Sequence, residues 1–309
     1  FGQQQPIYSQ YMLNTYLINP SVAGSEGLTV FNLTARNQWV GYEDGPKTYT
    51  LSYQSRILKT SFSKRSRLIK SRVKKRRPSG RVGIGGVIYN DVNGKIRRTG
   101  LQGTYSYHLH LRNVQLSMGA SLSFYQFDIN IKPSDLYDQI NDPILNKKLN
   151  KLSPDANIGL LLSNDKFYIG LSTTSLFQSS IQFSNDNSHT AYRLLRQYYL
   201  IGGYRIEPYR SLFSYEPSML ITSNEILNYS IDLNIKLIYK NDYYVSLSYR
   251  TVGATVFMVG LKYDKFLIGY AFDYNFTDVS YFSKNGTHEA SISYRIGDKN
   301  RKYRWLNRF

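Results

Sequence analysis

The chain has 309 residues and a formal net charge of +18, with 29 tyrosines, 15 phenylalanines and no cysteine. The lack of cysteine excludes a disulfide framework, a thiol nucleophile and a thiolate metal site. No apolar run reaches the roughly 18 residues that a membrane-spanning helix needs, which excludes a helical membrane protein. The chain opens at Phe1, which fits a mature product whose export signal has been removed.

Residues 1–27 are predicted to form a segment of their own. They are too irregular for a strand and too rich in Asn and Gln for a helix buried in lipid. The rest of the chain has the alternating pattern of a β-barrel, and a barrel of more than eight strands has more interior room than its own side chains fill. The segment is therefore expected either to plug the lumen of such a barrel or to be a leader without fixed structure.

Residues 28–297 alternate apolar with polar side chains in fourteen successive stretches. In Phe266–Phe276, for example, Phe, Ile and Tyr occupy one face, and Leu, Gly, Ala, Asp and Asn the other. The stretches average about 11 residues, close to the length of a tilted membrane strand. No other element could cover so much apolar surface, so we expect lipid to cover it. The predicted strands are 28–38, 47–58, 81–90, 97–111, 114–126, 155–163, 166–174, 194–206, 211–222, 227–240, 242–251, 254–263, 266–276 and 287–297.

The links between these strands alternate in length. Those after even-numbered strands are mostly minimal, as at Asn164-Asp165 and Asp264-Lys265, whereas 127–154 and 175–193 follow odd-numbered strands. Outer-membrane barrels have short periplasmic turns, long outer loops and an even strand count. The sequence therefore predicts an all-β fold, a closed antiparallel transmembrane β-barrel of about 14 strands in the outer membrane. A soluble secreted sheet protein is the alternative class, and it would dissolve without detergent.

Two strongly basic segments fall on the predicted periplasmic side. Residues 59–81 hold eleven Lys or Arg and no acid, and the tail 298–309 holds five more. Nucleic-acid binding is disfavoured, because stacking aromatic residues are missing and an outer-membrane barrel meets no genome. Two readings remain, a solvated loop without a partner and a docking site for acidic periplasmic components. The candidate docking residues are Lys64, Arg65, Arg67, Lys70, Arg72, Lys74, Lys75, Arg76 and Arg77.

No catalytic, cofactor or metal site is predicted. His108 and His110 are two residues apart and would share the lumen face, where they are expected to be polar lining. The chain has no GxSxG sequence and no nucleophile with a recognisable base.

Three motifs stand out along the chain. The first contains Gln10, Asn19, Pro20 and Gly24, and the third surrounds Glu289. The second lies between residues 36 and 48 and contributes Arg36, Gln38, Trp39, Gly41 and Pro46. Together these motifs resemble those of the PorP/SprF family of type IX secretion systems. The basic 59–80 insertion and the extension beyond the last strand depart from the family pattern.

The resemblance implies an outer-membrane component of the secretion and gliding apparatus of Bacteroidetes-type bacteria. Members are thought to anchor or help export surface adhesins through the adhesin's carboxy-terminal domain. They are also linked to the ring and lipoprotein components in the periplasm. The expected function is therefore a non-enzymatic anchor or export partner embedded in outer-membrane lipid. The alternative is an outer-membrane solute channel with an open or gated lumen.

Overall fold

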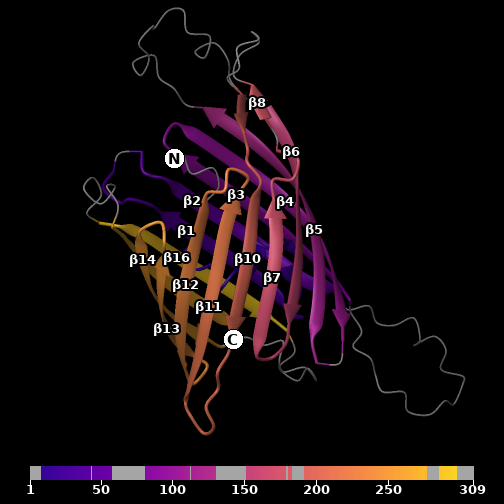
Figure 1. Ribbon diagram of the computed structural model, residues 1–309, viewed down its shortest axis with the longest axis vertical. Coiled ribbons are helices and arrows are strands. Elements are labelled where there is room, and N and C mark those ends of the chain that lie inside the picture. The colour runs from indigo at the N-terminus through magenta and orange to yellow at the C-terminus, as the bar shows by residue number, and fades with distance from the viewer. Residues whose placement is uncertain are drawn as a thin grey trace, which may run out of the picture.

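The computed structural model describes residues 8–42, 44–57, 81–111, 113–129, 151–178, 180–182, 191–276 and 285–297. Within them, fourteen antiparallel strands form a closed barrel, and β8 and β9 form a separate two-stranded sheet (Figure 1). The strands are β1 (Thr29–Asn37), β2 (Lys47–Ile57), β3 (Val82–Asn93), β4 (Ile96–His110), β5 (Gln115–Ile129), β6 (Lys151–Ser163), β7 (Phe167–Thr174), β8 (Ser180–Gln182), β9 (Ala191–Arg193), β10 (Gln197–Tyr204), β11 (Phe213–Asn224), β12 (Tyr229–Tyr239), β13 (Tyr243–Arg250), β14 (Ala254–Tyr263), β15 (Phe266–Asn275) and β16 (Thr287–Ile296).

The first and last strands close the barrel. β1 pairs with β2 on one side and with β16 on the other, in a register that runs from Thr29 opposite Ile296 to Asn37 opposite His288. Every neighbouring pair is antiparallel, and the order follows the chain except where β7 pairs with β10 across the β8–β9 hairpin. The predicted closed antiparallel barrel of 14 strands is confirmed.

Burial alternates along the strands, which defines an inner and an outer face. In β5, Gln115, Ser117 and Ser121 are buried, whereas Leu122 and Phe124 are exposed. Buried residues on the inner face are mainly small or polar, and exposed residues on the outer face are mainly aliphatic or aromatic. The outer face is therefore suited to hydrocarbon and the inner face to a polar interior. Among the described residues, no helix is both long and apolar enough to cross a membrane.

Three predicted boundaries were wrong. β5 and β6 extend into the stretch predicted as loop 127–154, because they keep pairing from Gln115 opposite Ser163 up to Phe127 opposite Lys151. The predicted loop 175–193 contains the β8–β9 hairpin. The predicted strand 194–206 is shorter in the structure, where β10 spans Gln197–Tyr204. Its run of four apolar residues still alternates, with Tyr199 and Ile201 buried and Tyr198 exposed.

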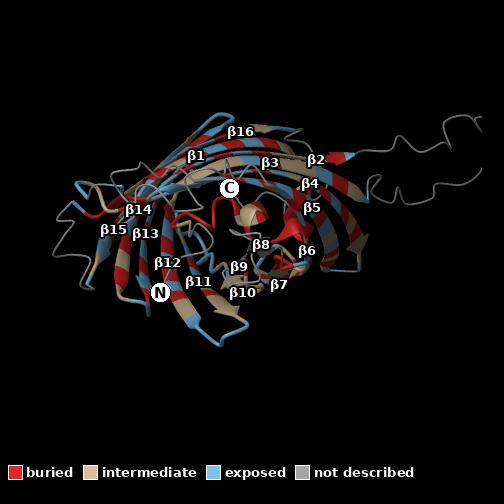
Figure 2. Ribbon diagram, turned by 90° about the horizontal axis from the view of Figure 1, so that it is seen from above, coloured by how far each residue is buried: buried red, intermediate tan, exposed pale blue. Residues whose placement is uncertain are grey.

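Residues 8–27 contact the inner face of the barrel and form two single-turn 3-10 helices, η1 (Thr15–Leu17) and η2 (Pro20–Val22). Figure 2 shows the segment inside the ring of strands, and η2 contacts β4, β5 and β6. Tyr11, Tyr16 and Ala23 are almost completely buried in one cluster with inward-facing side chains of the strands. Much of the apolar core of this protein therefore lies inside the barrel and is built around the segment.

Candidate functional site: the N-terminal segment and its buried ion network

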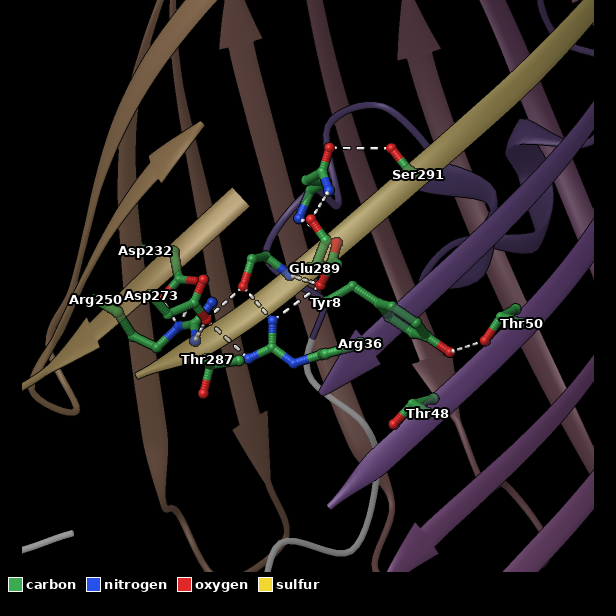
Figure 3. Close-up of polar contacts among 12 residues, drawn as sticks. Tyr8, Arg36, Thr48, Thr50, Asp232, Arg250, Asp273, Thr287, Glu289 and Ser291 are labelled. Atoms are coloured by element: carbon green, nitrogen blue, oxygen red, sulfur yellow. Dashed lines mark hydrogen bonds and ion pairs between the residues drawn. The ribbon is translucent and has the colours of Figure 1, made fainter. Parts of the chain in front are cut away.

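A buried network of charges lies at the closure between β1 and β16 (Figure 3). The guanidinium of Arg36, on β1, donates to Asp273 Oδ2 at 2.8 Å and to Glu289 Oε2 at 2.9 Å. Glu289 is the register partner of Arg36 on β16, and Asp273 lies on β15. All three side chains are at most 3 % exposed. Such charges are tolerated in a protein interior only when they are paired and hydrogen-bonded.

A second arginine extends the network around the wall. Arg250, on β13, donates from Nε to both carboxylate oxygens of Asp232, on β12, at 2.9 and 3.0 Å. Its Nη1 lies 4.0 Å from Asp273 Oδ2. Asp273 is therefore placed between two guanidinium groups, and five strands of one wall share a connected set of charges.

The N-terminal segment is bound directly to this network. The backbone N–H groups of Ser9 and Gln10 donate to the two carboxylate oxygens of Glu289, at 2.8 and 2.9 Å. The hydroxyl of Ser9 donates to Asp273 Oδ2 at 2.5 Å and accepts from Arg36. The side-chain amide of Gln10 donates to the Glu289 carbonyl and accepts from Ser291. The bonds of Ser9 and of the Gln10 backbone N–H have charged partners, and a bond to a charged group contributes about 1.5–3 kcal/mol.

Further along, the segment binds neutral inward-facing groups. The Asn14 amide donates to Ser52 Oγ at 2.9 Å, and the Tyr16 hydroxyl donates to Thr104 Oγ1 at 2.7 Å. The segment is therefore held by hydrogen bonds as well as by apolar packing.

Asn19 and Pro20 lie against three glycines of the wall. Asn19 caps η2 by accepting from Ser21 N at 3.0 Å, and its Nδ2 donates to the carbonyls of Leu160 and Leu171 at 3.0 and 3.3 Å. Pro20 is the first residue of η2, where its missing N–H costs nothing. A Cβ atom on the wall glycines would collide with Asn19 or Pro20. These glycines are Gly119, Gly159 and Gly170 on β5, β6 and β7.

The end of the segment lies beside β2 and β4. Gly24 has φ +67°, and a Cβ there would meet the Ser55 carbonyl at 2.8 Å, so only glycine fits. The Ala23 carbonyl accepts from Ser106 Oγ at 2.5 Å and lies 3.1 Å from His108 Nε2. His108 Nδ1 lies 2.8 Å from Ser117 Oγ, so both ring nitrogens have protein partners. No group of three or more His, Asp or Glu in the described ranges could hold a metal ion.

The segment contacts the barrel wall in both halves of the lumen. The Tyr8 hydroxyl lies 2.9 Å from Thr50 Oγ1, in the first half of β2. Glu26 Oε2 lies 3.6 Å from Arg295 Nη1, near the end of β16. Because β2 begins and β16 ends at opposite ends of the barrel, residues 8–26 extend from one half of the lumen into the other.

The residues of the second motif form the link between β1 and β2. Gln38 N donates to the Pro46 carbonyl at 2.8 Å, which closes the link at its base. Trp39 and Gly41 have positive φ values of 52° and 95°. Trp39 N donates to Thr287 Oγ1 on β16 at 3.2 Å. This link therefore contacts the same closure that holds the ion network.

The structure brings Gln10, Arg36 and Glu289 together, while Asn19 and Gly24 hold other parts of the same segment. Asp232, Arg250 and Asp273 were not predicted as site residues. Charged residues at inward positions of predicted strands were the available signal for them. The basic candidates, Lys64 through Arg77, and the tail 298–309 lie outside the described residues.

Comparisons with known proteins give one family and several barrels of low similarity. A family model described as "Type IX secretion system membrane protein PorP/SprF" matches residues 1–294. The outer membrane protein Omp33 of Acinetobacter baumannii is 8 % identical, with 88 % of this chain and 100 % of that chain covered and a TM-score of 0.47. A mutant of the TodX monoaromatic hydrocarbon channel is 10 % identical, with 91 % and 92 % covered and a TM-score of 0.45. No curated protein matches the chain.

Proposed function

Since the chain belongs to the PorP/SprF family of type IX secretion system membrane proteins and folds as an outer-membrane barrel, we propose a role for it in adhesin export. In this role the protein is a non-enzymatic anchor or export partner for a surface adhesin. One observation carries the choice of an anchor over a channel. Residues 8–27 run through the lumen and are bound to buried charges on its wall. An anchor needs a rigid barrel, whereas a channel needs open space.

The segment acts as a plug in this proposal. The backbone N–H groups of Ser9 and Gln10 donate to Glu289, and further along the segment Asn19 donates to backbone carbonyls of β6 and β7. Displacing it would leave the Asp273 and Glu289 carboxylates without these donors in a buried site. Each hydrogen bond to a charged group contributes about 1.5–3 kcal/mol, so spontaneous opening is disfavoured.

Planar-bilayer conductance tests the plug. We expect the intact protein to carry almost no ion current and a variant without residues 1–24 to form an open pore. A variant without the tail 298–309 is the control, because it shortens the chain but leaves the lumen contacts in place. Large, steady conductance in the intact protein would contradict the plug and favour the solute-channel alternative.

The adhesin and the periplasmic machinery then bind at opposite ends of the barrel. The outer links between β1 and β2, β5 and β6, β7 and β10, and β15 and β16 contact the carboxy-terminal domain of the adhesin. The basic segment 59–80 and the tail 298–309 dock to acidic surfaces of the periplasmic ring or lipoprotein components. What supports this division is the distribution of positive charge along the sequence, with eleven basic residues and no acid in 59–81.

Co-purification tests the docking surface. Replacing Lys74, Lys75, Arg76 and Arg77 with Gln is expected to reduce recovery of periplasmic partners, and most strongly at low salt, because exposed charges are screened at high salt. Lys147→Gln together with Lys148→Gln, in a predicted outer loop, is the matched control. Equal recovery from wild type and both variants at every salt concentration would remove the docking claim.

A further inference from the structure

The outer wall of the barrel has an apolar hollow of about 710 Å³. It spans β4, β5, β6, β7, β10 and β11, and none of its lining residues carries a charge. Exposed outward side chains dominate the lining, including Tyr105, Met118, Ile158, Leu160 and Leu171. Its volume is within the range of sites that hold small molecules.

The hollow lies directly behind the glycines that face Asn19 and Pro20. Gly119 and Gly159 belong both to its lining and to the positions where a Cβ would strike the segment. Without side chains on the inner face, the wall comes close enough for Asn19 to bind two of its backbone carbonyls. We attribute the concave outer surface to this close approach, since a wall drawn inward leaves space outside.

The chemistry of the hollow restricts its occupant. Because the outer face is in hydrocarbon, the occupant must be apolar where it meets the wall. An added β-strand is excluded here, because β6, β7 and β10 are already paired with neighbours on both sides and offer no free edge. An acyl chain has no hydrogen-bonding groups to satisfy and fits a lining of aliphatic and aromatic side chains.

The positively charged side chain of Arg81 lies at one end of the hollow. Tyr107 lines the hollow, and its hydroxyl accepts from Arg81 Nη1 at 3.3 Å. Arg81 is exposed and lies just before β3, at the end of the barrel where short turns join β4 to β5 and β6 to β7. A guanidinium can bind a phosphate through two parallel hydrogen bonds. The apolar hollow and the adjacent cation together match the two parts of a phospholipid.

We infer that the hollow is a specific phospholipid site, with an acyl chain against Leu160 and Leu171 and the phosphate at Arg81. The inference depends on the outer-membrane location of the barrel but not on the identity of any secretion partner. A bound lipid would stiffen the part of the wall that holds Asn19 from behind.

Native mass spectrometry of the full-length protein tests the site. The protein is purified in detergent, incubated with phosphatidylglycerol, and transferred to lipid-free detergent before measurement. Ala120→Trp fills the hollow, since Ala120 lines it and points outward. Ala290→Trp is its control, because Ala290 is exposed on the outer face of β16, away from the hollow. Arg81→Gln removes the cation, and Lys265→Gln is the corresponding control in the exposed turn between β14 and β15.

We expect wild type to keep one lipid per barrel. Ala120→Trp should lower the retained fraction of lipid about tenfold, which is the change in affinity expected when about two methylene groups of the acyl chain are no longer buried. Arg81→Gln should lower it as well, while both controls behave like wild type. Loss of all lipid from wild type, or equal losses in Ala120→Trp and Ala290→Trp, would overturn the inference. Recovery of a bound polypeptide that only Ala120→Trp releases would assign the hollow to a protein instead.

Discussion

Replacement of Arg36 by methionine removes the central cation of the buried network without a large change in volume. Arg36 donates to Asp273 at 2.8 Å and to Glu289 at 2.9 Å, so the substitution removes the closest cation of both carboxylates. Breaking a buried ion pair by removing one partner costs about 3–5 kcal/mol. Arg250 remains 4.0 Å from Asp273, which places the expected loss at the lower end of that range for this carboxylate. The free energy of unfolding from lipid vesicles, followed by tryptophan fluorescence in urea, measures the loss.

A double-mutant cycle separates the network from simple loss of packing. Glu289→Met alone should also destabilise, because Arg36, Ser9 N and Gln10 N lose an acceptor. The variant with both changes should cost clearly less than the sum of the two, since neither charge is then left alone. Arg97→Met, at an exposed position, is the control and should stay within about 0.5 kcal/mol of wild type. Strict additivity of Arg36→Met and Glu289→Met would refute the coupling described for this network.

Three further substitutions test how the segment is held. Gly159→Val should lower the free energy of unfolding by about 1–3 kcal/mol, because the valine side chain would overlap Asn19. Gly103→Val is the control and should be nearly neutral, since a Cβ there meets nothing within 4 Å. Equal urea midpoints for the two variants would contradict the close approach of Asn19 to Gly159. Asn19→Asp should speed amide hydrogen exchange over residues 18–25 more than Asn19→Ala does, because a carboxylate would face the carbonyls of Leu160 and Leu171. Faster exchange in Asn19→Ala than in Asn19→Asp would count against the hydrogen bonds from Asn19 to these carbonyls. Tyr16→Phe should cost about 0.5–1.5 kcal/mol in the same urea assay through loss of the bond to Thr104, and no change would show that this bond contributes nothing.

The wall of the barrel was predictable because period-two alternation is a local property of each strand. Phe266 to Phe276 could be assigned face by face from the sequence, and the structure agrees. Boundaries were harder where a polar residue and a proline extend a strand, as at Ser153 and Pro154 in β6, which lie before the predicted start of the strand at residue 155. The separate hairpin β8–β9 was missed because three-residue strands are too short to show a period.

The ion network was only partly accessible from the sequence. Arg36 and Glu289 were identified through the family motifs, but Asp273, Asp232 and Arg250 were not. Alternation shows that a charge points inward, but it does not show which charge on another strand lies beside it. Arg36 and Glu289 are 253 positions apart, and only the closure of the barrel brings them together. The register of β1 against β16 is therefore the information that no local pattern contains.

The position of Ser9 and Gln10 has a consequence for biogenesis. Their acceptor, Glu289, belongs to the last strand, while other contacts of the segment reach β2, β4, β6 and β7. The binding site for the segment is thus complete only after the final strand has joined the first. Residues 8–27 precede every strand of the barrel in the chain, yet they can complete their native contacts only after the last strand has joined.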